Sequence, residues 1–264
     1  MARKTLFRSV DADGTVEVVQ EPSGVRTLHF GTASKQTVLD PQAPHKLILP
    51  YTRALTAGLL FRPDPGRILL IGLGGGALVH FFLHHFPRAR IDVVERCPRV
   101  LAAARELFAL PEGDPRLRVH LGDGREFLAH PGEAGGGGWD FLITDAFDAR
   151  GPAEGTLARA FHETVRSRLS EGGVLAANLW SGQSGRLRRS LRTMETVYGR
   201  PVYRLRPKGK ANVAALAGRP GLPERESVDL ESRAVALQER LGLEYPRFLA
   251  DMSPAGGGWL RGLA

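Results

Sequence analysis

The sequence is poor in cysteine, in aromatic residues and in long apolar runs, and each shortage excludes a class of protein. A single cysteine, Cys97, cannot form an internal disulfide or a zinc site built from cysteines, and we expect no metal site. No apolar run is long enough to span a membrane, and no signal-peptide core follows the charged segment 1–4. We therefore expect a cytoplasmic protein with no membrane contact.

Acidic residues are outnumbered by basic ones. The chain carries 36 Lys and Arg against 28 Asp and Glu, which gives a net charge of +8. The densest basic clusters, 186–189 and 204–210, contain no aromatic residues that would stack on bases. We therefore expect no nucleic-acid partner. The contents of hydrophobic residues (42%) and charged residues (24%) are those of an ordinary globular protein.

The chain is organised around the stretch Arg67–Gly76, where an apolar run enters a cluster of glycines. A continuous apolar run of this length predicts a strand buried on both faces. The glycines let the backbone turn sharply, and the apolar segment 77–86 predicts a helix whose N-terminus faces a ligand. A glycine-rich turn can also be a plain connection, so this stretch alone leaves both interpretations open.

Acidic residues close three further predicted strands. Strand 91–94 ends in Glu95, strand 117–121 runs into Asp123 and Gly124, and strand 139–144 is followed by Asp145 and Asp148. Ligands of open α/β sheets bind at the carboxyl ends of the strands, and an acid about twenty residues after the glycines contacts a ribose. The pattern indicates a nucleoside site, although each acid taken alone could be a surface, turn or helix-capping residue.

The first 60 residues differ from the rest. Short β-type runs at 16–19, 27–30 and 36–39 predict a small sheet, and the apolar segment 47–60 predicts a helix. Strands and helices then alternate, and we expect a fifth strand at 173–179, a hairpin over 202–217 and a helix at 228–241. We predict an α/β chain with a small β-rich N-terminal domain and connecting helix at 1–60 and a nucleotide-binding α/β domain at 61–264.

These motifs resemble the spermidine synthase family of aminopropyltransferases. The resemblance covers roughly residues 15–215 and is carried by Arg67–Gly76, Val93-Val-Glu, Gly122-Asp-Gly, Thr144-Asp-Ala-Phe-Asp and Gly151-Pro-Ala-Glu-Gly. It implies that residues 61–264 form a Rossmann-like catalytic domain, with the fold of S-adenosylmethionine-dependent transferases, behind the small β-rich domain, and it often implies a homodimer. It also implies that decarboxylated S-adenosylmethionine donates an aminopropyl group to a small amine and leaves as methylthioadenosine.

The resemblance also implies roles for individual residues. Asp145 is the catalytic carboxylate, and Asp148 orients the nucleophile. Tyr51 is the retained residue of the acceptor side. The implied donor-binding residues are Gln36 for the nucleoside, Gly72, Gly74 and Gly75 of the glycine turn, Glu95 for the ribose, and Asp123 and Gly124 for the adenine.

Three departures from the family pattern leave the transferred group and the acceptor open. Gly75 stands where the family has an aspartate that grips the ammonium of the donor, and its loss relaxes the discrimination against full S-adenosylmethionine. Thr52 and Arg53 replace a histidine and a glutamate, so a polyamine would meet a cation at Arg53. Asp148 is followed by Ala149 and not by proline. The alternatives are an S-adenosylmethionine-dependent methyltransferase and a non-catalytic nucleoside-binding protein.

Overall fold

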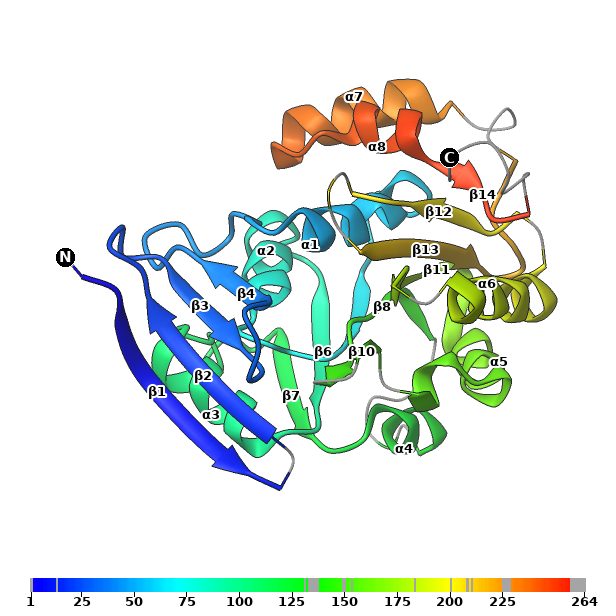
Figure 1. The fold of residues 1–264 in the computed structure, drawn as a ribbon. Coiled ribbons are helices and arrows are strands. Elements are labelled where there is room, and N and C mark those ends of the chain that lie inside the picture. The colour runs from blue at the N-terminus through cyan, green and yellow to red at the C-terminus, as the bar shows by residue number, and fades with distance from the viewer. Residues whose placement is uncertain are drawn as a thin grey trace.

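The computed structural model describes residues 2–12, 14–130, 132, 138–148, 151–152, 154–182, 184–199, 201–207, 209, 211–224 and 229–256. Within these ranges the chain forms a small antiparallel sheet, a large mixed sheet and a two-stranded ribbon (Figure 1). Among the described residues, no helix is long and apolar enough to cross a membrane.

The small sheet is made by the N-terminal residues and has the strand order β1-β2-β3-β4. Its strands are β1 (Lys4–Asp11), β2 (Gly14–Gln20), β3 (Arg26–His29) and β4 (Lys35–Leu39). Each strand pairs with the next in antiparallel fashion. The three short strands expected here are confirmed, and β1 is an addition. Its side chains are largely exposed, which is why it lacks a clear apolar pattern.

The large sheet has the order β14-β12-β13-β11-β8-β5-β6-β7. The five strands from β11 to β7 are parallel, and β13, β12 and β14 extend the β11 edge in antiparallel fashion. The strands are β5 (Arg67–Ile71), β6 (Arg90–Glu95), β7 (Leu117–Leu121), β8 (Trp139–Thr144), β11 (Leu169–Trp180), β12 (Tyr203–Leu205), β13 (Asn212–Gly218) and β14 (Ser253–Pro254). The ribbon pairs β9 (Phe147–Asp148) with β10 (Gly151–Pro152).

Helices cover both faces of the large sheet. They are α1 (Pro50–Leu55), η1 (Thr56–Leu60), α2 (Ala77–His85), α3 (Pro98–Leu107), α4 (Gly124–Ala129), η3 (Glu154–Leu157), α5 (Arg159–Arg168), α6 (Ser184–Tyr198), α7 (Leu230–Leu241) and α8 (Tyr245–Asp251). One apolar core packs under α1, η1, α2, α3, α7 and α8, and the other packs under α4, α5 and α6. Figure 1 shows α7 and α8 stacked beyond α1 and β12, far from α4 and α5.

The central strand β5 joins these two cores. Ile68 and Leu70 belong to the first core, and Leu69 and Ile71 belong to the second. All four side chains are at most 4% exposed, which confirms the prediction of a strand buried on both faces. Because the strands beside β5 run parallel to it, they all end at one edge of the sheet, where the glycine turn and the acidic residues follow.

Two predictions of local structure need refinement. The helix expected over 47–60 is a short α-helix continued by a 3₁₀-helix, α1 and η1. The last helix begins at Leu230 and is followed by α8 and β14, which the sequence pattern did not indicate. The division of the chain into units at residues 1–60 and 61–264 stays a prediction.

Gly58 in η1 allows this helix to lie directly on the sheet. A Cβ at Gly58 would overlap the ring of Phe141 on β8 and lie 3.2 Å from the Cγ1 of Val174. Alanine is the better helix former by about 1 kcal/mol, but overpacking a rigid core costs about 1–3 kcal/mol.

We expect Gly58→Ala to lower the free energy of unfolding by about 1–2 kcal/mol, since the overlap outweighs the gain in helix propensity. Urea unfolding monitored by circular dichroism measures this change. Gly113→Ala is the matched control, because a Cβ at that position meets nothing within 4 Å. Equal stability of the two variants would contradict the packing argument.

Candidate active site

A cavity of about 460 Å³ lies at the carboxyl edge of the parallel strands. This volume is within the usual range for small-molecule sites. The structure brings most of the predicted site residues into its lining, namely Gln36, Tyr51, Gly72, Gly74, Glu95, Asp123, Gly124 and Asp145. Gly75 is not part of the lining, and the side chain of Asp148 lies outside the described residues.

Gly72 brings the end of β5 against the end of β8. Its φ angle of +102° is one that other residues rarely adopt, and a Cβ there would overlap the backbone carbonyl group of Asp145. The backbone N–H of Asp145 donates to the carbonyl of Ile71 at 2.8 Å. Glycine is therefore required at position 72, because the backbone of Asp145 occupies the space of a side chain.

The carboxylate of Asp145 is held by neutral groups. Asn178 on β11 donates from Nδ2 to Oδ1 of Asp145 at 2.7 Å, and the neighbouring Tyr51 hydroxyl is a second available donor to this carboxylate. Burial raises the pKa of Asp145 to about 7, partly offset by these two donors, while the charge of Glu95 raises the pKa further. Within the described part of the chain, no Lys or Arg forms an ion pair with Asp145. The group can thus take up or release a proton near neutral pH.

Tyr51 is placed on Asp145 by α1. Its hydroxyl oxygen lies 2.7 Å from the carbonyl oxygen of Gln36, to which it donates. Burial, together with the neighbouring Asp145, raises the pKa of Tyr51 well above its ordinary value. The phenol therefore keeps its single proton, which can be donated to Gln36 or to the ionised Asp145.

Two further carboxylates line the cavity. Glu95 accepts hydrogen bonds from the backbone N–H groups of Leu73, at 3.0 Å, and Cys97, at 2.8 Å. Asp123 is the N-cap of α4 and accepts from the backbone N–H of Arg125 at 2.8 Å. The side-chain hydrogen bond from Arg125 holds the pKa of Asp123 below its usual value. Both carboxylates are thus fixed by the backbone, and their predicted contacts with ribose and adenine stay predictions.

The space beside Gly75 is occupied. Its φ angle is not positive, but a Cβ there would lie 2.7 Å from Cγ2 of Thr37 and 2.9 Å from Cδ1 of Phe108. The backbone N–H of Gly75 donates to Oγ1 of Thr37 at 2.8 Å. Two side chains therefore fill the place where the family pattern has an aspartate, and Gly75 contributes backbone alone.

Arg53 does not lie where the sequence analysis placed it. Its neighbours Tyr51 and Thr52 line the cavity, but Arg53 does not. Its guanidinium forms an ion pair with Glu244, at the start of α8 on the outer side of α1. The expectation that an acceptor meets this cation in the cavity is wrong, because alternate sides of α1 face the cavity and α8.

Sequence reasoning missed two polar side chains of the site. Asn178 holds Asp145 and in turn accepts from Nδ2 of Asn212 on β13 at 3.1 Å. Thr37 caps the glycine turn through Gly75. The only signal for Asn178 was an amide within an otherwise apolar strand. Among the described residues, no group of three or more His, Cys, Asp or Glu side chains is arranged to hold a metal ion.

The raised pKa of Asp145 predicts a pH-dependent stability. In the unfolded chain this carboxyl has its ordinary pKa near 3.8, whereas in the folded chain its pKa is about 7, so the folded state binds the proton more tightly. The resulting stabilisation is complete below pH 4 and is lost as the pH rises to 7. An asparagine side chain at this position keeps the oxygen that Asn178 contacts and carries no charge. We therefore expect Asp145→Asn to raise Tm by at least about 2 °C at pH 8 and by less at pH 5, measured by calorimetry.

Asp140→Asn is the control of opposite sign. The Asp140 carboxylate is held by Ser170, by the backbone N–H groups of Gly66 and Arg67, and by an ion pair with Arg62. Burial acts to raise its pKa, but these contacts bring the pKa below its ordinary value. This variant should therefore lose stability at pH 8. If the Tm difference between Asp145→Asn and the parent does not change with pH, the assignment of a raised pKa to Asp145 is contradicted.

Three comparisons with known proteins point to the same family. The Spermine/spermidine synthase domain matches residues 49–186. A polyamine aminopropyltransferase of Chromobacterium violaceum is 32% identical over 249 residues, which cover 94% of this chain and 92% of the relative. Spermidine synthase from Thermotoga maritima has the same fold, with a TM-score of 0.72, 16% identity and coverage of 94% of this chain and 83% of that one.

A methyltransferase-like protein also has a related structure. Human methyltransferase-like protein 13, in complex with SAH, superposes with a TM-score of 0.59 at 25% identity, covering 83% of this chain and 96% of that one. The match to the polyamine aminopropyltransferase covers more of this chain than the match to the methyltransferase-like protein. This match and the match to the Spermine/spermidine synthase domain agree with the motifs at the four strand ends and with the cavity that they line. The chain belongs to the spermine/spermidine synthase family.

Proposed function

We propose that this protein transfers an aminopropyl group from decarboxylated S-adenosylmethionine to a small amine. The observation that carries the proposal is the carboxylate of Asp145, which lines the cavity and is held by Asn178 and Tyr51 with a pKa of about 7. The polyamine aminopropyltransferases that resemble this chain over most of its length support the same reaction class.

The reaction needs an amine with a free lone pair. The amine nitrogen attacks the carbon next to the sulfonium, the carbon–sulfur bond breaks, and its electron pair stays on sulfur as methylthioadenosine leaves. Because the amine arrives as an ammonium ion, Asp145 takes up one of its protons before the attack, and the product keeps its charge as a secondary ammonium ion. A carboxylate that is ionised only above about pH 7 is a stronger base than an ordinary aspartate. In this proposal Asp148 orients the amine.

The donor lies across the glycine turn in this proposal. Glu95 accepts from the ribose hydroxyls, and Asp123 with Gly124 contacts the adenine. Gly72 and Gly74 let the sulfonium approach the backbone, and Gln36 contacts the nucleoside from β4. These residues line one continuous cavity, which supports a single elongated ligand. Homodimer formation and a cytoplasmic location stay predictions.

A second candidate is methyl transfer from full S-adenosylmethionine. The observation that favours it is Gly75, where Thr37 and Phe108 fill the place of the family's aspartate. Without that negative charge, the carboxylate of the full cofactor meets less repulsion. The related fold of a human methyltransferase-like protein in complex with SAH is compatible with this alternative.

The activity test is transfer from decarboxylated S-adenosylmethionine to a panel of monoamines and diamines, with methylthioadenosine release as the readout. We expect kcat/KM to rise with pH to a plateau, with a midpoint near 7, because Asp145 must be ionised. Asp145→Asn should lower kcat at least about 100-fold with little change in methylthioadenosine affinity. Asp251→Asn, an exposed carboxylate on α8, is the control. A variant without Asp145 that keeps full activity would refute the catalytic role.

The donor test is calorimetric titration with decarboxylated S-adenosylmethionine, the full cofactor and methylthioadenosine. We expect all three to bind, and we expect Glu95→Gln to weaken each by about tenfold, since a charge-assisted hydrogen bond to the ribose is lost. A preference for the decarboxylated form supports aminopropyl transfer. Equal or tighter binding of the full cofactor favours methyl transfer, and unchanged affinities in Glu95→Gln would place the nucleoside elsewhere.

A further inference from the structure

The helix that carries Tyr51 into the cavity is too short to hold its own position. Helix α1 has six residues, no side-chain hydrogen bond at its N-cap and no acidic residue in its first turn. Helices of this length are not stable by themselves, so tertiary contacts must fix them. The position of the Tyr51 hydroxyl at Asp145 therefore depends on what holds the opposite side of α1.

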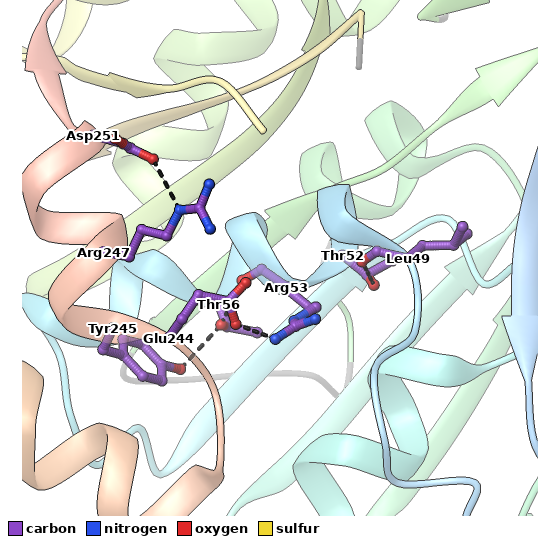
Figure 2. A network of polar contacts seen from close by, with 8 residues as sticks. All are labelled: Leu49, Thr52, Arg53, Thr56, Glu244, Tyr245, Arg247 and Asp251. Atoms are coloured by element: carbon purple, nitrogen blue, oxygen red, sulfur yellow. Dashed lines mark hydrogen bonds and ion pairs between the residues drawn. The ribbon is translucent and has the colours of Figure 1, made fainter. Parts of the chain in front are cut away.

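The start of α8 holds that side through two polar contacts (Figure 2). The carboxylate of Glu244 forms an ion pair with Arg53. The hydroxyl of Tyr245, whose side chain is fully buried, donates to Oγ1 of Thr56 at 3.0 Å. Thr56 in turn donates to the backbone carbonyl of Arg53 at 2.7 Å. The two contacts thus converge on the end of α1.

Glu244 is the N-cap residue of α8, yet its side chain makes no hydrogen bond to the helix that it begins. The carboxylate pairs with Arg53 instead of capping α8. Within the described residues, Glu244 is the one carboxylate that pairs with Arg53. Both groups are about one-third exposed, at 32% and 34%, so the attraction is worth less than a fully buried pair. The effect of this ion pair is to fix the position of α1 against the start of α8.

The segment 51–56, which covers most of α1 and the first residue of η1, has two sides. Tyr51 and Thr52 line the cavity, whereas Arg53 and Thr56 contact the start of α8. We propose that Glu244 and Tyr245 are positioning residues, which act through the outer side of α1 to keep its cavity side in register with the carboxylate at the end of β8. This inference rests on the proposed function, in which Asp145 is the base.

The C-terminal helices have a second attachment that does not involve α1. Arg240 on α7 forms an ion pair with Asp64 at 2.6 Å and donates to the carbonyl of Pro63 at 2.6 Å. Removing this attachment loosens the docking of the helices while leaving the contacts of Arg53 and Thr56 in place. It supplies a control for general packing effects.

The first experiment is a double-mutant cycle on turnover. We expect Glu244→Gln to lower kcat about fivefold with little change in donor KM, and Tyr51→Phe to lower it by at least as much. If Glu244 acts through Tyr51, the double variant is no slower than Tyr51→Phe alone. Effects that multiply in the double variant would overturn the proposal.

Further variants separate positioning from stability. The charge exchange Arg53→Glu with Glu244→Arg should restore kcat to within about twofold of the parent, because the ion pair is re-formed. Asp64→Asn should leave kcat unchanged. A fall in kcat for Asp64→Asn that equals the fall for Glu244→Gln would show that docking of the helices alone matters. Tyr245→Phe removes only the hydroxyl and should behave like Glu244→Gln in the same cycle.

A second readout does not need turnover, so that failure of the proposed function can be told apart from failure of this inference. The titration of Asp145 is followed by ¹³C-carboxyl NMR, with its signal assigned by its loss in Asp145→Asn. The hydrogen bond from Tyr51 lowers the pKa of this carboxyl. Glu244→Gln should therefore raise the titration midpoint, as should Tyr51→Phe, and the double variant should show no further rise. A midpoint that does not move in Glu244→Gln would refute the positioning role even in a protein without activity.

Discussion

Burial destabilises the ionised form of a carboxylate unless neighbouring groups solvate it, and the hydrogen-bonding partners of Asp145 are neutral. The amide of Asn178 and the hydroxyl of Tyr51 supply hydrogen bonds that favour the charged form, while burial opposes it more strongly. A cation in their place would lower the pKa of the carboxyl and make it a poor base. The neutral partners keep its pKa near the pH at which it must accept a proton.

The fold brings these partners together from separate parts of the chain. Asn178 comes from β11 and is itself held by Asn212 of β13, so the antiparallel extension of the sheet contributes to the site. Tyr51 comes from the segment before the sheet and is fixed by the backbone of Gln36 on one side. Gly72 leaves space for the backbone of Asp145. Each contact joins parts of the chain that are far apart in sequence, and the folded sheet alone makes them adjacent.

The sequence predicted what depends on local pattern. The apolar run before Gly72, and the acids that follow β6, β7 and β8, indicated strands and a common edge because strand ends in a parallel sheet meet there. The partners of those acids were not predictable in the same way. Asn178 lies 33 residues from Asp145, and Glu244 lies 191 residues from Arg53. Pairing at such distances depends on tertiary packing, and the residue type of Arg53 gave no indication that it faces away from the cavity.

Gly75 illustrates how a change at one position is compensated by its surroundings. An aspartate there would have to displace Thr37 or the ring of Phe108, and a ring in a packed core is not displaced cheaply. Thr37 also satisfies the backbone N–H of Gly75, so moving it leaves a polar group without its partner. The missing charge is therefore built into the packing around the turn and is not a single-residue difference. Selection between an ammonium and an amino-acid group on the donor must come from other parts of the cavity, where Glu95, Asp123 and Asp145 are the carboxylates of the described lining.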